Sequence, residues 1–169
     1  CQNHQPYFGE ILIASPEGPY VMVESSSFTS GNGSNDEDEV IQFGETVSLS
    51  LNLENVGNDA ANDVQVSISS DDSYISIISG TTSTSYIASD GTATVSGLEF
   101  VVSTAVPNEH DIELACSISA GGETWESNLN FTAYAPVIEV SSVIGSLDPG
   151  VSTSLEAHLL NTGGADIHS

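Results

Sequence analysis

The stretch from Gly44 to Gly57 reads GETVSLSLNLENVG, and the rest of the sequence is best understood outward from it. Apolar residues occupy every second position from Val47 to Leu53, with polar residues between them. A period of two is typical of a β-strand with one buried face. The stretch ends in Asn55-Val56-Gly57, residue types that favour a tight turn. It therefore predicts a strand followed by a turn.

The same pattern returns near the C-terminus, where residues 150–163 read GVSTSLEAHLLNTG. Its Gly, Leu, Asn and Gly positions follow those of the first stretch by a constant 106 residues (161 minus 55, for example). Two further segments, PYVMVESS from Pro19 and PVIEVSS from Pro136, are separated by 117 residues (136 minus 19). Constant offsets of this kind predict a repeat protein, with 11 additional residues (117 minus 106) in the first copy.

Short alternating segments separated by Gly, Asn, Asp and Ser recur along the chain, without a convincing helical period. They predict an all-β fold of immunoglobulin-like antiparallel β-sandwich repeats, one complete and one truncated. Residues 1–18 are expected to be the last strand of a preceding domain plus a Pro/Gly linker. Residues 19–135 form the complete sandwich, with an acidic insertion at 30–39, and 136–169 begin the second. Strands of the complete unit are expected at 21–23, 47–53, 64–68, 74–78, 85–87, 94–103, 112–118 and 125–133.

The charge balance is extreme, with 24 Asp and Glu residues and no Lys or Arg. No cation is available to neutralise nucleic-acid phosphates or anionic lipids, which argues against both partners. No apolar run is long enough to span a bilayer. A saline habitat, avoidance of Arg/Lys-specific proteases, or excision between basic cut sites would each remove Lys and Arg. The 14% of charged residues is low for a salt-adapted surface and favours the latter two. The strand-dense, Ser/Thr/Gly/Asn-rich composition favours a secreted or cell-surface protein.

Several phrases resemble the region after the catalytic domain of gingipain-like cysteine peptidases and related type IX-secreted Bacteroidetes proteins. Asn3-His4-Gln5-Pro6-Tyr7 resembles the HNYxPY phrase of the small immunoglobulin-like domain there. Residues 44–60 and Leu147-Asp148-Pro149-Gly150 resemble phrases of the tandem β-sandwich repeats. The resemblance covers nearly the whole chain and implies a non-catalytic, exported region. The family's catalytic His and Cys motifs have no match here, Gly150-Val151 replaces the usual Gly-Glu, and the lack of Lys and Arg is unusual.

Candidate catalytic groups are few. His110 and Cys116 form one nearby Cys/His pair. Cys116 shares the phase of Ile112, Leu114 and Ile118 and is expected to be buried, whereas His110 is expected in a loop. We therefore predict no catalytic site and no enzyme, although the parent protein could be a cysteine peptidase. For Cys1, lipidation, a disulfide and the mere start of a fragment remain open.

One candidate metal site lies in the acidic insertion. Its oxygen-bearing side chains suit a hard cation such as Ca²⁺ on a flexible loop. They are Asn35, Asp36, Glu37, Asp38 and Glu39. The competing interpretation is a solvated acidic face, because the spacing does not match an EF-hand. The aromatics Tyr74, Phe100, Trp125 and Phe131 allow a carbohydrate platform, but in a sandwich they are more often core.

The favoured function is a non-catalytic extracellular structural or adhesion module: a stalk, spacer or filament subunit. Its partners would be other copies of itself or neighbouring β-sandwich domains, with strand Tyr7–Ser15 of one copy completing the C-terminal unit of another. One alternative is an accessory fragment of a gingipain-like peptidase that anchors the protease or positions substrate. Another is a calcium-dependent module that binds a glycan or a host or cell-surface protein.

Overall fold

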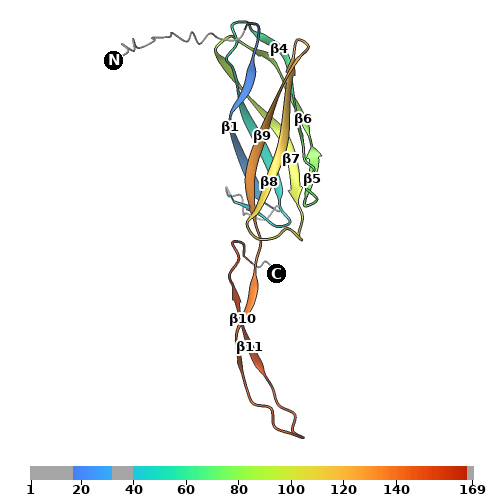
Figure 1. The fold of residues 1–169 in the computed structure, drawn as a ribbon, viewed down its shortest axis with the longest axis vertical. Helices are drawn as coiled ribbons and strands as arrows, with labels where there is room; N and C mark the ends of the chain where they lie inside the picture. Colours follow the sequence, from blue (N-terminus) through green and yellow to red (C-terminus); the bar gives the residue numbers. More distant parts are fainter. Residues whose placement is uncertain (1–16, 32–39, 167–169) are drawn as a thin grey trace, which may run out of the picture.

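The computed structural model describes residues 17–31 and 40–166, which form two stacked sheets and a separate hairpin (Figure 1). The first sheet has the order β1-β3-β7-β5 and is antiparallel throughout. Its strands are β1 (Val21–Gly31), β3 (Thr46–Asn55), β7 (Gly91–Val102) and β5 (Ile75–Ser79). The predicted all-β, immunoglobulin-like β-sandwich is confirmed.

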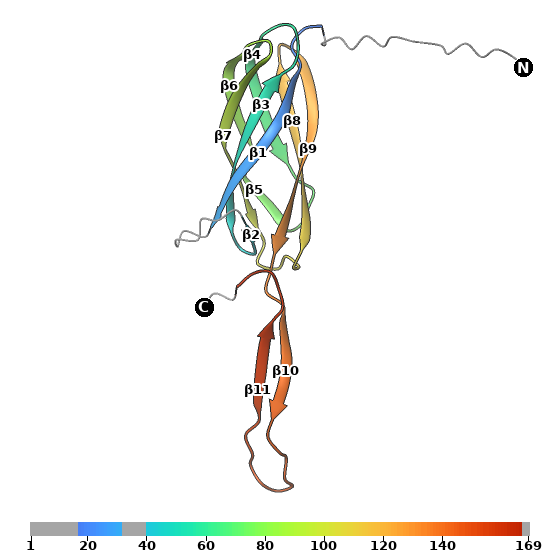
Figure 2. The same ribbon diagram turned by 90° about the vertical axis from the view of Figure 1, so that its left-hand side faces the viewer.

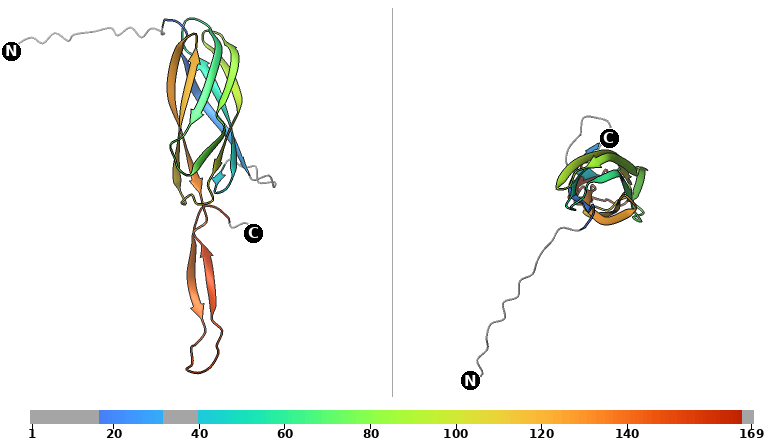
Figure 3. Two further views of the ribbon diagram at one scale, coloured as in Figure 1. Left: turned by 90° about the vertical axis from the view of Figure 1, so that its right-hand side faces the viewer. Right: turned by 90° about the horizontal axis from the view of Figure 1, so that it is seen from above.

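The second sheet has the order β2-β9-β8-β4-β6. Its strands are β2 (Ile41–Gln42), β9 (Glu123–Tyr134), β8 (His110–Ala120), β4 (Ala61–Ser69) and β6 (Thr81–Ile87). Only β2 runs parallel to its neighbour, pairing Ile41 and Gln42 with Ala133 and Tyr134. Seen from above, the two sheets enclose a single interior (Figure 3).

The core lies between the sheets and follows the period of two read from the sequence. Val47, Leu49, Leu51 and Leu53 of β3 are at most 1% exposed. Leu114, Cys116 and Ile118 of β8 are equally buried in the facing sheet, as the phase of Cys116 predicts. Each such aliphatic side chain contributes about 1.5–3 kcal/mol when it is removed from water, so the alternation of β3 is a large part of what holds the sandwich together.

Below the sandwich, β10 (Ile138–Ile144) and β11 (Glu156–Asn161) form a two-stranded antiparallel hairpin of their own. It continues the long axis of the sandwich, as two perpendicular views show (Figures 1 and 2). None of the described residues belongs to a helix long and apolar enough to cross a membrane.

Three local expectations were wrong. His110 is not in a loop but is the first residue of β8, and Ser30 and Gly31 end β1 rather than lying in the acidic loop. The expected first strand, 21–23, extends to Gly31 because β1 pairs with β3 along its whole length. The serines of β1 conceal this in the sequence, since an edge strand with an exposed middle needs no apolar alternation. The short β2 was not predicted at all.

Candidate functional site

An asparagine clasp closes the end of the β1–β3 pair. Asn55 is fully buried, and its Oδ1 accepts hydrogen bonds from the backbone N–H groups of Tyr20 (3.0 Å) and Gly57 (3.1 Å). Its Nδ2 donates to the carbonyl oxygen of Asp59 (2.8 Å) and also to those of Ile87 and Ala88. One side chain thus satisfies buried backbone groups from three segments of the chain, which are costly to leave unpaired.

The hairpin has the same clasp. Oδ1 of Asn161 accepts from the N–H groups of Val137 and Gly163, both at 3.0 Å, and Nδ2 donates to the carbonyl oxygen of Ala165 at 2.8 Å. Both clasps also require a glycine two residues after the asparagine. A Cβ at Gly57 would lie 2.2 Å from the backbone carbonyl oxygen of Gly18, and a Cβ at Gly163 would lie 2.2 Å from that of Ala135.

Strand register is also conserved between the two pairs. The six paired positions of β10 and β11 correspond to pairs of β1 and β3 at the sequence offsets of 117 and 106. Val140 pairs with Leu159 as Val23 pairs with Leu53, for example. A bulge follows Val23 in β1 and Val140 in β10. The hairpin therefore has the structure of the first strand pair of the sandwich.

What differs is burial. In the sandwich, Leu49 and Leu53 are at most 1% exposed because β7 and the facing sheet cover them. The corresponding Leu155 and Leu159 are 51% and 66% exposed. Other side chains of the same hairpin face are also open to solvent; they are Ile138, Val140, Val143 and Ala157. We call these six residues the open inner face. Soluble proteins rarely leave apolar side chains gathered in this way uncovered.

A joint connects the hairpin to the sandwich. Oδ1 of Asn108, in the loop between β7 and β8, accepts hydrogen bonds from the N–H groups of Ala135 (3.2 Å) and Gly164 (2.9 Å). Gly164 also lies against the ring of Tyr134, where a Cβ would be 2.4 Å from Cδ1. The segments that enter and leave the hairpin thus meet the base of the sandwich at one amide. Sequence reasoning missed Asn108, because a single loop asparagine has no periodic signal.

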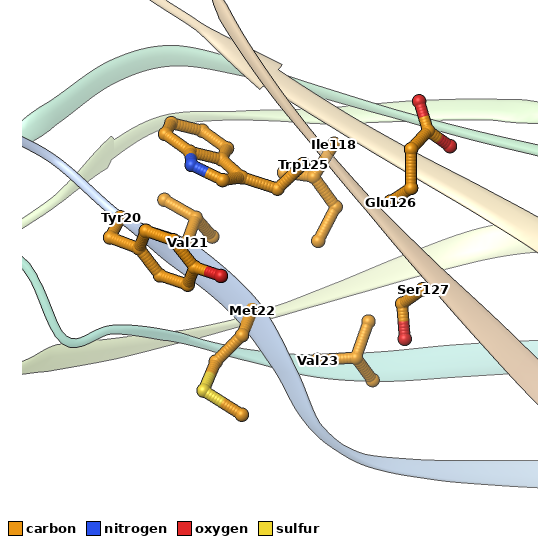
Figure 4. Close-up of a pocket in the computed structure, with 8 residues that line it drawn as sticks. All are labelled: Tyr20, Val21, Met22, Val23, Ile118, Trp125, Glu126 and Ser127. Atoms are coloured by element: carbon orange, nitrogen blue, oxygen red, sulfur yellow. The ribbon is translucent and has the colours of Figure 1, made fainter.

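A groove of about 210 Å³ lies between β1 and β9, the strands that flank one side of the sandwich (Figure 4). Tyr20 and Trp125 close one end, with ring centroids 5.9 Å apart and planes inclined by 54°. Met22, Val23 and Ile118 also line it, whereas the carboxylate of Glu126 points away from the rings and accepts from Ser117. Because the two rings contact each other, the sides that face one another are not available to stack on a sugar.

The four aromatics that suggested a carbohydrate platform do not share a surface. Phe100 is fully buried, and Phe131 packs against it with ring centroids 6.3 Å apart. Trp125 and Tyr74 are partly buried against the core. Trp125 pairs with Ile118 near one end of β8, whereas Tyr74 contacts His110 at the other end. These rings have the core role that the sequence also allowed.

His110 and Cys116 are engaged separately. Nε2 of His110 lies 2.7 Å from Oδ2 of Asp72, and its ring stacks edge-on with Tyr74. Cys116 is fully buried, and burial, followed by the charge of Glu126, raises the pKa of its thiol to about 11. A thiol in this state is a poor nucleophile. The His110–Asp72 pair joins the β4–β5 loop to the start of β8, which is a structural role.

The predicted calcium ligands Asn35, Asp36, Glu37, Asp38 and Glu39 lie outside the described residues, as do Cys1 and the strand expected at Tyr7–Ser15. The calcium site and the orphan strand therefore stay predictions. Within residues 17–31 and 40–166, no group of three or more His, Cys, Asp or Glu side chains is placed to hold a metal ion.

Comparisons with known proteins add little beyond the fold. No protein-family model matches the sequence, and no curated protein does. Among solved structures, a similar one is native alpha-2-macroglobulin from Escherichia coli, spanning domain MG7 to the C-terminus. The identity is 13% and the TM-score 0.47, and the match covers 75% of this chain but only 19% of that one.

Proposed function

We propose that this chain is a non-catalytic structural or adhesion module of a secreted or cell-surface protein, built from β-sandwich units arranged end to end. The observation that carries the proposal is the repetition of the Asn55 clasp at Asn161, with the same partners and the same strand register. Because the repeated strand pairs lie along one axis, each additional unit would lengthen the molecule. Repeat architectures of this kind serve as spacers and extended binding surfaces.

The joint supports the same function. Asn108 bonds to the chain on both sides of the hairpin, at Ala135 before β10 and at Gly164 after β11, so that the second strand pair has a defined orientation. A flexible linker would need no such contact. Two observations support the secreted or cell-surface location. The charge of −24 maintains solubility, and the sequence resembles repeats of exported Bacteroidetes proteins. Assembly with other copies or neighbouring sandwich domains, through strand addition, is the second part of the proposal.

Solution X-ray scattering of the whole chain tests the spacer function. We expect a maximum dimension greater than the length of the sandwich alone, because the hairpin extends from one end of it. Asn108→Ala should broaden the distance distribution, because two N–H groups lose their acceptor, whereas the exposed Asn62→Ala on β4 should leave it unchanged. A compact scattering profile for the unmodified chain, with the hairpin folded back on the sandwich, would overturn the proposal.

A further inference from the structure

The strand pair of the hairpin and the first strand pair of the sandwich begin differently. The hairpin meets the base of the sandwich, its lower end in Figure 1, through Asn108, Tyr134 and Gly164. We propose that this base accepts a following β-sandwich unit only where the clasp glycine of that unit is followed by a second glycine and then by a small uncharged residue. The sandwich itself has Asn58 and Asp59 at these positions and cannot dock on a preceding unit in the same way. This inference rests on the proposed function and specifies which junctions of such a spacer have a fixed orientation.

The requirement for the second glycine comes from the ring of Tyr134. A Cβ at Gly164 would lie 2.4 Å from Cδ1 and 3.0 Å from Cγ of that ring. Cγ is only two bonds from the backbone of β9, so the ring can yield little without a shift of the strand. The N–H of Gly164 also donates to Oδ1 of Asn108 at 2.9 Å, which holds the glycine in this position. A side chain at position 164 would therefore push the hairpin away from the sandwich.

The start of the sandwich shows what another residue does at this position. Asn58 corresponds to Gly164 (164 minus 58 is 106), and Gly18 corresponds to Ala135 (135 minus 18 is 117). Oδ1 of Asn58 accepts the N–H of Gly18 at 2.8 Å. In the hairpin, the corresponding N–H of Ala135 donates to Asn108 of the sandwich at 3.2 Å. The first strand pair thus binds with its own side chain the N–H group that the hairpin donates to the unit before it.

Two neighbouring positions differ in the same sense. Ala165 is 4% exposed beside the joint, whereas the corresponding Asp59 is exposed. The counterpart of Tyr134 is Glu17 (134 minus 17 is 117), which is also exposed. Burial of a carboxylate without a cationic partner is costly, and this chain has no Lys or Arg to provide one. The start of the sandwich is therefore suited to solvent, and the start of the hairpin is suited to a docked joint.

NMR of the whole chain tests the inference through residual dipolar couplings, which report whether two parts of a molecule share one orientation. In the unmodified chain, we expect the amides of β10, β11 and the sandwich to fit one common alignment. Gly164→Asn and, separately, Ala165→Asp should remove the hairpin from that alignment, while contacts between β10 and β11 persist. Asp166→Asn is the matched control, because it places an amide side chain at an exposed neighbouring position. It should leave the common alignment unchanged.

A second measurement follows the bond at the start of the sandwich. Asn58→Gly should make the amide proton of Gly18 exchange with water about fivefold faster, because its acceptor is lost. Asn62→Ala, an exposed position on β4, should leave that exchange rate unchanged. An exchange rate at Gly18 that does not respond to Asn58→Gly would overturn the inference.

A common alignment that survives either Gly164→Asn or Ala165→Asp would also overturn it. So would unfolding of the hairpin by Gly164→Asn, because Asn58 occupies the same position in a folded strand pair. Separate alignment of the hairpin in the unmodified chain would show that the joint is not docked. The spacer function is tested independently, because an elongated scattering profile of the unmodified chain would still support it after any of these results.

Discussion

Asn55 and Asn161 make the same three side-chain hydrogen bonds in two different places. Each accepts two N–H groups through Oδ1 and donates through Nδ2 to the carbonyl four residues later. Only Asn55 also donates to Ile87 and Ala88, which belong to the junction of β6 and β7. The three shared bonds depend on one strand pair, and the additional two depend on a completed sandwich.

Removal of the Asn55 side chain should therefore be severe. Asn55→Ala leaves two N–H donors and at least one carbonyl acceptor without a partner in the core, and we expect a loss of about 3 kcal/mol in the free energy of unfolding. Urea denaturation followed by tryptophan fluorescence would measure it. Asn161→Ala is the matched control and should leave the unfolding of the sandwich unchanged. Equal effects of the two substitutions would contradict the distinction.

Gly57 should not tolerate even a methyl group. A Cβ there would lie 2.2, 2.5 and 2.8 Å from backbone atoms of Gly18, Tyr20 and Pro19, which cannot move independently. We expect Gly57→Ala to destabilise the sandwich by about 3 kcal/mol in thermal or chemical unfolding. Gly122→Ala is the comparison, because its φ of 94° gives conformational strain but no atom lies within 4 Å. A smaller loss for Gly57→Ala than for Gly122→Ala would count against the clash.

Acid should weaken the contact between Asp72 and His110. Burial tends to raise the pKa of Asp72, but hydrogen bonds from the N–H of Tyr74 and from His110 outweigh it and hold the pKa below the ordinary 3.8. A depressed folded-state pKa stabilises the protein above the unfolded-state value, and this stabilisation is lost as pH falls through the folded-state value. Below about pH 4, the Tm of the unmodified protein should thus fall more steeply than that of Asp72→Asn. Asp71→Asn, an exposed neighbour, should keep the steeper fall.

Cys116 should be inert in the folded protein. With a pKa of about 11, roughly one thiol in a thousand is ionised at pH 8, and the sulfur is fully buried. In a Cys1→Ser background, we expect negligible reaction with a thiol reagent until denaturant is added, and then one equivalent of labelling. Rapid labelling of the native protein would show that β8 opens far more readily than its core position implies.

The calcium prediction for residues 35–39 has a separate test. If Asn35, Asp36, Glu37, Asp38 and Glu39 bind Ca²⁺, the Tm should rise with added Ca²⁺ and fall on chelation, because binding to the folded state alone stabilises it. Replacing the four carboxylates by their amides should remove the response. A Tm that is insensitive to both Ca²⁺ and chelator would eliminate the site.

Much of this fold was present in the sequence because it depends on local rules. The alternation from Val47 to Leu53 specifies a strand with one buried face, and the constant offset from Asn55 to Asn161 specifies a second strand pair of the same kind. The turn predicted at Asn55-Val56-Gly57 follows β3, which ends at Asn55. These signals are readable because a strand has a fixed period and a tight turn accepts few residue types.

Other features depend on contacts between residues far apart in the chain, and the alternation could not reveal them. The serines of β1 form a strand only because β3 provides a partner along its length. Asn108 holds the hairpin only because the fold brings Ala135 and Gly164 to its amide, and nothing in its neighbourhood in the sequence marks it. Leu53 and Leu159 have the same local pattern, yet one is fully buried and the other 66% exposed. Pattern specifies which face of a strand is apolar, whereas only packing against other strands determines whether that face is covered.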